Sequence, residues 1–411
     1  MIQAPRGTSD VLGEDALARE RVAAEARAIL ERAGFARIET PTFEATELFA
    51  RGVGEATDVV QKEMYTFDDG GGDSLTLRPE GTAPVCRAYV EHGMHKLPQP
   101  VKLWYVSTFF RRERPQAGRY RQFWQVGAEA IGSDDPAVDA ECILLLGELL
   151  EALGCRDVTL VVGSLGSPEA REEYRTELRA HLRAHEDRLS GDVRARIDSN
   201  PLRAFDAKDP GTRQVMQDAP RLLDRLPADD LDHFAEVRAL LDEAGQAYEI
   251  DTTLVRGLDY YTRTLFEYQS GTLDAAQNAL GGGGRYDRLI EQIGGPRTPG
   301  MGWAAGVERM LMAAPAQPVA PAPLDLYVAY AKPEHKAAAF RLAADARRAG
   351  HPARLELGGR SLKGQLKQAD RAGARYVAIL GDEGTSLKDM ETGEQREVET
   401  GTVMHHITQG L

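Results

Sequence analysis

Residues 102–129 read KLWYVSTFFRRERPQAGRYRQFWQVGAE, and the fold of the chain is interpreted outward from this stretch. An apolar run from Leu103 to Val106 and a second run from Tyr120 to Val126 flank a Pro and Gly turn at 115–118. Two such runs joined by turn residues are typical of a β-hairpin. The sequence therefore predicts a hairpin at the centre of the first domain.

The predicted hairpin is basic although the chain is acidic. Between Lys102 and Arg121 there are six Lys or Arg residues and one acid, Glu113, in a chain whose net charge is -14. A solvated basic tip would explain the charge. The arginines alternate, however, with Phe109, Phe110, Tyr120, Phe123 and Trp124. Forked planar donors beside aromatic faces suit a polyphosphate that carries a flat base, so the hairpin is interpreted as a nucleotide clamp.

Length and composition restrict the class of protein. A chain of 411 residues is expected to form two or three domains. It has no apolar run of about 18 residues and no targeting pattern at its N-terminus, so no membrane partner and a cytoplasmic location are expected. The acidic balance argues against a general nucleic-acid coat, and no DNA partner is expected. Cys86, Cys142 and Cys155 lack metal spacing and are expected to be reduced.

Composition also divides the chain. Residues 1–166 and 246–314 are expected to form one α+β domain, interrupted by a charged, helical insertion at 167–245. A Pro/Ala linker at 315–324 leads to 325–411, where strand and helix patterns alternate as in a small α/β domain with a parallel sheet. His181, His185 and His233 of the insertion are not expected to bind metal, and no structural metal site is predicted.

Elements near the N-terminus are less clear from the pattern. The apolar spacing at 14–33 predicts a helix that Gly34 ends. A short strand interrupted by Pro41 is expected next, with a loop that continues to Asp58. Proline inside a strand indicates an edge or an interface.

Four further blocks combine groups that suit a pocket. A strand at 74–77 ends at a Pro/Gly corner with Glu80 and Thr82, where a carboxylate and a hydroxyl could hold an ammonium group or simply cap a helix. RGLDYY at 256–261 is either a core hairpin or a recognition loop between two strands. Gly281 to Gly284 form either a flexible turn or bare backbone that a ligand approaches. The small residues of GMGWAAG, before Arg309, suggest a helix that packs closely.

Taken together, these blocks resemble those of the class II aminoacyl-tRNA synthetases, and closely those of the histidyl-tRNA synthetases. The resemblance covers nearly the whole chain. The motifs that carry it are TLRPEGTAPVCRAYV, FRRERPQAGRYRQFWQVGAE, LVRGLDYYTRTLFE, GGGGRYD, GWAAGVERML and GGRSLKGQLKQADRAGARYVAIL. The family's fold implies an antiparallel sheet core flanked by helices, a helical insertion, a C-terminal anticodon-binding domain and a homodimer formed partly around Pro41.

The resemblance also implies roles for individual residues. Arg256 and Arg111 would be catalytic, at the reacting carboxylate and the α-phosphate of ATP. ATP would contact Arg111, Glu113, Arg119, Phe123 and Arg309. Histidine would contact Glu80, Gly81, Thr82, Arg111, Gln125, Glu129, Arg256, Tyr260 and Tyr261, with Glu129 and Tyr261 on the imidazole. Histidine tRNA would contact Gln116, Arg360, Lys363 and Lys367.

The reaction that the resemblance implies is ATP-dependent activation of L-histidine, with Mg²⁺ accompanying ATP, followed by transfer to the 3′ end of the tRNA. A carboxylate is already a nucleophile at neutral pH, so arginines and Mg²⁺ that stabilise charge suffice. Two alternatives stay open: a non-enzymatic paralogue that regulates another enzyme, and a tRNA-like sensor. The chain departs from the family at Trp124, a position that is often His, and at 381–393, where a hairpin is short.

Overall fold

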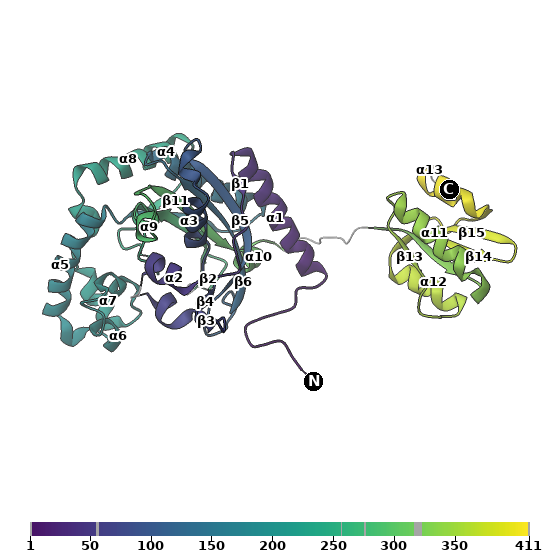
Figure 1. Ribbon diagram of the computed structural model, residues 1–411, viewed down its shortest axis with the longest axis horizontal. Helices are drawn as coiled ribbons and strands as arrows, with labels where there is room; N and C mark the ends of the chain where they lie inside the picture. The colour runs from purple at the N-terminus through teal and green to yellow at the C-terminus, as the bar shows by residue number, and fades with distance from the viewer. Residues whose placement is uncertain (1, 55–56, 256, 275–276, 316–322, 410–411) are drawn as a thin grey trace. The chain divides into compact units, whose positions relative to one another are not determined.

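The computed structural model describes residues 2–54, 57–255, 257–274, 277–315 and 323–409. The chain divides into two compact units, Met1–Gln317 and Pro318–Leu411. Each unit is described by itself (Figure 1). None of the described helices is long and apolar enough to cross a membrane.

An eight-stranded sheet forms the centre of the first unit. Its strands run in the order β1 (Ala36–Arg37), β5 (Val101–Phe110), β6 (Gln122–Ile131), β11 (Gly300–Gly306), β10 (Ala279–Arg285), β9 (Thr262–Ser270), β7 (Val158–Ser164) and β8 (Glu249–Ile250). The six inner strands are antiparallel, and β1 and β8 pair with their neighbours in parallel. The antiparallel core that the resemblance implied is confirmed.

The basic hairpin is β5 and β6, paired from Val101 with Ile131 to Phe110 with Gln122. Both strands are longer at their inner ends than the sequence pattern predicted. Tyr120 and Arg121, expected in the second strand, instead belong to the loop between the strands. The alternation of side chains sends Leu103 and Tyr105 to one face of the sheet and Trp104 to the other.

Helices cover both faces of this sheet. On one face lie α1 (Glu14–Arg32), α4 (Pro136–Ala152), α10 (Val307–Ala313) and part of α8 (Ala228–Glu243). On the other lie α2 (Thr46–Val53), α3 (Thr82–Glu91) and α9 (Leu289–Gln292). The α1 prediction is confirmed: Val22, Ala26 and Ile29 recur at helical spacing and are buried.

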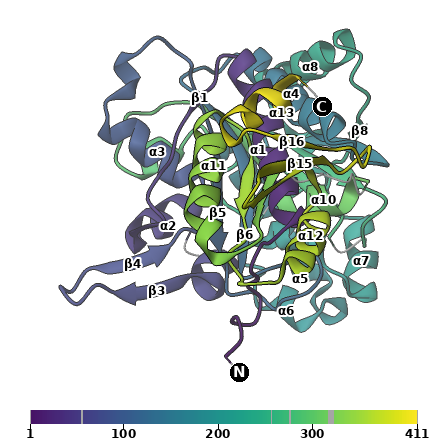
Figure 2. The same cartoon turned by 90° about the vertical axis from the view of Figure 1, so that its right-hand side faces the viewer.

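A second, three-stranded sheet joins β2 (Phe43–Ala45), β4 (Ser74–Leu77) and β3 (Tyr65–Asp68). Figure 2 shows the β3–β4 hairpin projecting from the body of the unit. The loop expected up to Asp58 is wrong, because α2 occupies 46–53 and a π-helical turn occupies Val59–Glu63. Burial of Leu48, Phe49 and Val53 in the core stabilises α2.

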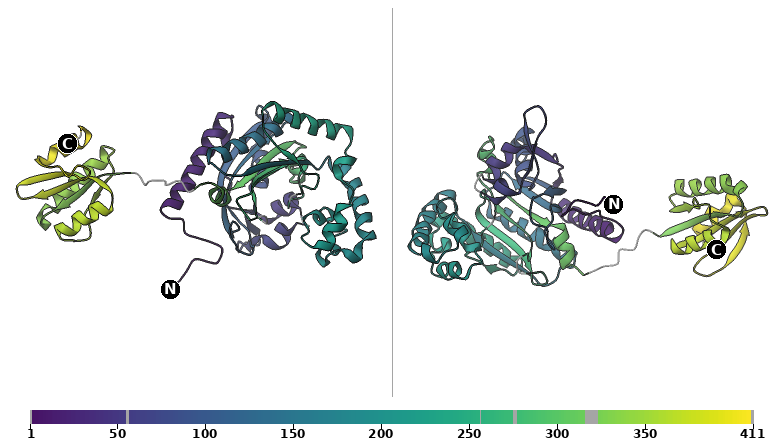
Figure 3. Two further views of the ribbon diagram at one scale, coloured as in Figure 1. Left: turned by 180° about the vertical axis from the view of Figure 1, so that it is seen from behind. Right: turned by 90° about the horizontal axis from the view of Figure 1, so that it is seen from below.

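The insertion is helical, as its composition predicted. It contains α5 (Pro168–Ala184), α6 (Gly191–Arg194), α7 (Pro210–Gln217) and α8, joined by short 3₁₀ turns. The helices α5 to α7 lie at the end of the first unit that is remote from α1 (Figures 1 and 3). The strand expected before RGLDYY is only the two-residue β8, so the residues between β8 and β9 are mostly loop.

Two glycine-rich segments differ from the sequence expectation. Gly281 to Gly284 are neither turn nor loop, because they lie in the buried strand β10. GMGWAAG at 300–306 is strand β11 rather than helix, and α10 begins only at Val307. A Cβ on Gly283 would lie 1.9 Å from the carbonyl oxygen of Gly302 on the neighbouring strand. Only glycine permits this close approach of the two strands.

The second unit is a five-stranded sheet in the order β13 (Ala353–Leu355), β12 (Leu324–Tyr330), β14 (Ala374–Gly381), β15 (Gly384–Asp389) and β16 (Gln395–Val398). The first three strands are parallel, as predicted, and the last two are antiparallel additions. The helices α11 (Lys336–Arg348) and α13 (Val403–Gln409) cover one face, and α12 (Leu362–Arg371) covers the other (Figure 3).

Candidate active site

A cavity of about 250 Å³ opens between the β5–β6 hairpin, the Glu80 corner, the loop before β9 and the glycine strands. Its walls bring together most of the residues that the resemblance singled out. The predicted residues that line it are Glu80, Gly81, Thr82, Arg111, Glu113, Arg119, Phe123, Gln125, Tyr260, Tyr261, Gly281, Gly282 and Arg309. Arg256 lies outside the described residues.

One end of the cavity is cationic. Arg111 lies over the ring of Phe123, 5.3 Å from its centre, and its Nε donates to the carbonyl oxygen of Pro79 at 2.9 Å. Arg309 donates to the carbonyl oxygens of Gly118 and Ala279, both at 2.9 Å. Burial and the charge of Arg119 lower the pKa of the Arg309 guanidinium, although it remains a cation. Backbone carbonyls thus fix two guanidinium groups without neutralising them.

Glu113 is the acid within this cationic end. Its carboxylate forms an ion pair with Arg119 and lies 4.0 Å from Arg111. The side chain is only 8% exposed. The arrangement leaves a net positive charge, which is suited to a polyphosphate.

The opposite end of the cavity is built around the Glu80 corner. The carboxylate of Glu80 accepts hydrogen bonds from the backbone N–H groups of Thr82 at 2.8 Å and Ala83 at 3.0 Å. Glu80 therefore caps α3, and Thr82, considered as a possible cap, is instead the first residue of that helix. Tyr260 donates to the same carboxylate at 3.4 Å. Burial raises the pKa of Glu80 even so.

Glu129 lies behind this end, fully buried and not among the residues that line the cavity. Its carboxylate accepts from the hydroxyls of Thr82 at 2.8 Å, Tyr286 at 2.6 Å and Tyr105 at 3.4 Å. Burial raises the pKa of Glu129 to about 8. Thr82 links it to the cavity wall.

Sequence reasoning missed Tyr105 and Tyr286 as members of this group. Tyr105 stands in β5, whose alternation indicates only that its side chain faces one side of the sheet. Tyr286 follows the glycine run in GGGGRYD, so its position beside a motif was the available signal. The ring of Tyr260 lies 6.0 Å from that of Tyr286 and 4.7 Å from that of Tyr261.

Gln125 and Trp124 occupy successive positions of β6 and therefore point to opposite sides of the sheet. Gln125 lines the cavity, and its buried Oε1 has no hydrogen-bond partner among the described residues. Trp124 packs on the other face, with Arg19 of α1 5.3 Å from its ring centre. An oxygen without a partner beside Glu80 is ready to accept a hydrogen bond from a ligand.

Glu308 is a second cavity residue that the sequence pattern did not single out. It accepts from the backbone N–H of Trp124 at 3.1 Å and pairs with Arg19 at 2.9 Å. Burial raises its pKa. These contacts tie α1, β6 and the start of α10 together immediately before Arg309.

Comparisons with known proteins agree with this geometry. A family model described as histidyl-tRNA synthetase matches residues 7–310, and one described as anticodon binding domain matches residues 325–409. The histidine–tRNA ligase of Halothermothrix orenii is 46% identical over 97% of this chain and 96% of its own. That of Rubrobacter xylanophilus is 47% identical over 97% and 96%.

The chain belongs to the histidyl-tRNA synthetase family.

Solved structures of this family have the same fold. The apo histidyl-tRNA synthetase of S. aureus superposes with a TM-score of 0.81 at 35% identity, covering 99% of this chain and 100% of that one. A Bacillus halodurans protein titled as an ATP phosphoribosyltransferase regulatory subunit/histidyl-tRNA synthetase shares the fold alone, with a TM-score of 0.67 at 21% identity.

The residues expected to contact tRNA lie in both units of this synthetase-family chain. Gln116 is exposed in the β5–β6 loop, where it bridges to Arg119. Lys363 and Lys367 are exposed one turn apart on α12. Arg360 is exposed just before α12 and pairs with Glu356 at 3.1 Å. Their roles remain predictions.

Histidines and cysteines outside the cavity have structural partners. His181 and His185 contact backbone carbonyls of Val215 and His181, respectively, and His233 contacts Asp139. Cys86 and Cys142 are free and buried, and Cys155 is free and half-buried. Burial raises the pKa of all three thiols, which leaves them protonated and unreactive at neutral pH.

Proposed function

We infer that the protein is a histidine–tRNA ligase. It activates L-histidine with ATP to histidyl adenylate and then transfers histidine to the 3′ end of histidine tRNA, with release of diphosphate and AMP. The observation that carries the proposal is the single cavity with a cationic end at Arg111 and Arg309 and an acidic, phenolic end at Glu80 and Tyr260. ATP phosphates and an amino acid fit these two ends. The reaction needs ATP and tRNA, so we place it in the cytoplasm.

The first step is an in-line attack of the histidine carboxylate on the α-phosphorus of ATP. Negative charge grows on the equatorial phosphate oxygens, and Arg111 is the residue assigned to it. Arg309 and Arg119 hold the departing diphosphate, and Phe123 supports the adenine. Pro79, Gly118 and Ala279 hold the two fixed guanidiniums in place before the substrate arrives. Groups preorganised in this way lower the barrier without reorganising during the reaction.

Mg²⁺ fits the same end of the cavity by the chemistry of its donors. Glu113 offers a hard carboxylate oxygen there, and its described contacts are to arginines that a triphosphate would also engage. The ion, bound with ATP, would neutralise charge on the phosphates.

Histidine is assigned to the other end. The ammonium group would be held by Glu80 and by Oε1 of Gln125, which has no other partner among the described residues. Glu129 and Tyr261 are assigned to the imidazole. Polar groups buried in this way reject apolar amino acids, because those would leave the groups unpaired, a penalty of about 10⁴ in comparable sites.

Domain roles and assembly complete the proposal. Residues 1–166 and 246–314 would form the catalytic domain, 167–245 the insertion, 315–324 the linker and 325–411 the anticodon-binding domain. A homodimer would form partly through the small sheet. Phe43 and Phe67 are 49% and 42% exposed and pack edge to face there, an apolar surface that a second copy would cover. Sedimentation of wild type against Phe67→Glu tests the dimer: the variant should sediment as a monomer.

The activity is tested by ATP–diphosphate exchange with each of the twenty amino acids. Exchange with histidine alone is expected. A non-enzymatic regulator or a tRNA sensor would give no exchange with any amino acid, and that result would reject the proposal.

A further inference from the structure

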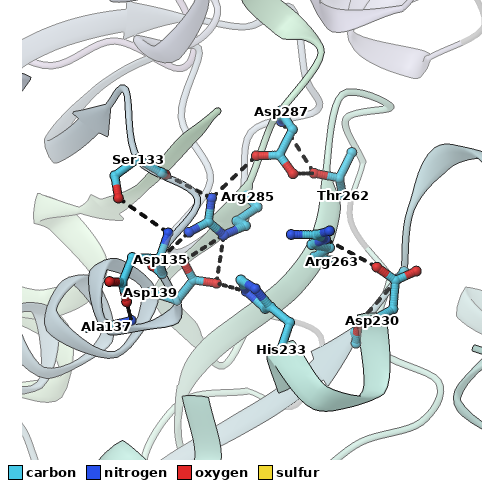
Figure 4. A network of polar contacts seen from close by, with 12 residues as sticks. Ser133, Asp135, Ala137, Asp139, Asp230, His233, Thr262, Arg263, Arg285 and Asp287 are labelled. Atoms are coloured by element: carbon cyan, nitrogen blue, oxygen red, sulfur yellow. Dashed lines mark hydrogen bonds and ion pairs between the residues drawn. The ribbon is translucent and has the colours of Figure 1, made fainter. Parts of the chain in front are cut away.

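Two residues of the insertion's last helix reach into the core of the first unit (Figure 4). Asp230 and His233 are three positions apart on α8, so they share one side of it. They are 2% and 7% exposed. Neither has a part in the reaction proposed above.

Asp230 holds the backbone that follows the two cavity tyrosines. Its carboxylate accepts from the N–H of Ser167 at 2.7 Å and from Nε of Arg263 at 3.1 Å. Arg263 has a φ of 44°, a left-handed conformation that is costly for a residue with a side chain. Its own backbone is pinned to Gly166 at 2.8 Å and Leu165 at 2.7 Å. The strained residue immediately after Tyr260, Tyr261 and Thr262 is therefore fixed from the insertion.

His233 holds the end of the glycine strand. Its Nε2 lies 2.9 Å from a carboxylate oxygen of Asp139. Nε of Arg285 lies 2.8 Å and 3.0 Å from the two oxygens of the same carboxylate. Arg285 is fully buried, and it also donates to the backbone carbonyls of Ser133 and Asp135. It is the last residue of β10, whose Gly281 and Gly282 line the cavity.

The two contacts of α8 are joined at their far ends. The hydroxyl of Thr262 donates to Asp287 at 3.1 Å, and Arg285 donates to the other oxygen of that carboxylate at 3.4 Å. Thr262 and Arg285 are also register partners of β9 and β10. A continuous polar network thus links α8 to both walls of the amino-acid end of the cavity, the tyrosine loop and the glycine strand (Figure 4).

We propose that Asp230 and His233 are positioning residues for the amino-acid pocket: through Arg263 and through Asp139 and Arg285, they set the distance between Tyr260–Tyr261 and the glycine strand. The inference rests on the proposed function, because it assigns that end of the cavity to histidine. The cationic end is held by other contacts, those of Arg111 and Arg309 to backbone carbonyls. A fault in the α8 network should therefore affect the amino acid and spare ATP.

The test is histidine-dependent ATP–diphosphate exchange by the full chain carrying Asp230→Asn, His233→Leu or His233→Gln. The first two should raise KM for histidine about tenfold or more, since small misplacements cost this much, and leave KM for ATP within about twofold. His233→Gln should recover most of the loss, because its amide can still donate to Asp139. Asp232→Asn, on an exposed residue of the same helix, is the matched control.

Assays are run below the unfolding temperature of each variant, and Arg263→Lys is added because its side chain is 28% exposed and the change keeps its charge. Equal rises in both KM values, values like the control for all variants, or failure of His233→Gln to exceed His233→Leu would each overturn the inference. Wild type without histidine-dependent exchange would reject the proposed function itself. Wild-type exchange with control-like variants would reject only the role of α8.

Discussion

Glu129 shows how one buried acid can serve both specificity and pH response. It is fully buried and surrounded by three hydroxyl donors. A Cβ on Gly302 would lie 1.8 Å from its Oε2, so the neighbouring strand leaves no room for rearrangement. A carboxyl group in such a place is costly to ionise, and the hydroxyl donors offset only part of that cost.

Stability should therefore depend on pH through this residue. The folded-state pKa of about 8 lies above the model value of 4.5. Between these values the folded state binds more protons than the unfolded state, so stability is lost as pH rises from about 4.5 to about 8. Glu129→Gln should flatten that decline, by an amount on the order of a few kcal/mol. Urea unfolding at pH 5, 7 and 8.5 measures it. Glu173→Gln, exposed on α5, should keep the wild-type slope; identical slopes for both variants would contradict the assignment.

Arg111 tests the cationic end at the same scale. Its guanidinium uses one N–H on Pro79 and its face on Phe123, leaving the fork for phosphate. Lysine lacks the fork and the planar face, so Arg111→Lys should lower kcat/KM for ATP in the exchange assay about 10² to 10³-fold. Arg112→Lys, at the exposed neighbouring position, should change it little. Comparable losses in both variants would show that loop order, not the Arg111 fork, limits the rate.

At the scale of elements, some of this fold was predictable and some was not. Alternating apolar residues predicted β5 and β6, and helical spacing predicted α1. Strands β10 and β11 were missed because glycine has no side chain with which to display a two-residue period. The contacts of Tyr105 and Tyr286 with Glu129 were beyond sequence reasoning, because they join three strands distant in the chain.

The close packing of β10 on β11 gives a prediction for the glycine run. A Cβ at residue 283 would meet Gly302 O at 1.9 Å and Trp303 Cα at 2.6 Å, and backbone cannot move aside cheaply. Gly283→Ala should therefore destabilise the first unit by about 1–3 kcal/mol and weaken histidine activation. Thermal unfolding followed by circular dichroism measures the first effect. Gly191→Ala, where a Cβ would meet nothing within 4 Å, is the control and should unfold like wild type.

At the scale of the whole molecule, the chain separates chemistry from tRNA recognition. The cavity lies entirely in the first unit, whereas the family model described as anticodon binding domain matches residues 325–409. In that second unit, α11 and α12 cover opposite faces of the sheet, and both expose basic side chains. The two faces therefore provide a matched pair for testing which one meets tRNA.

If α12 contacts the tRNA backbone, the double variant Lys363→Ala/Lys367→Ala should raise KM for histidine tRNA in aminoacylation and make charging less sensitive to salt, because fewer counterions are then released on binding, with a slope of roughly 0.7 per lost contact on single strands. Histidine-dependent diphosphate exchange should be unchanged, since neither lysine lies in the cavity unit. Lys336→Ala/Arg341→Ala removes the same charge from α11. If that control weakens charging as much as the α12 variant does, net charge rather than a defined face recognises the tRNA; if it does not, the phosphates lie along α12.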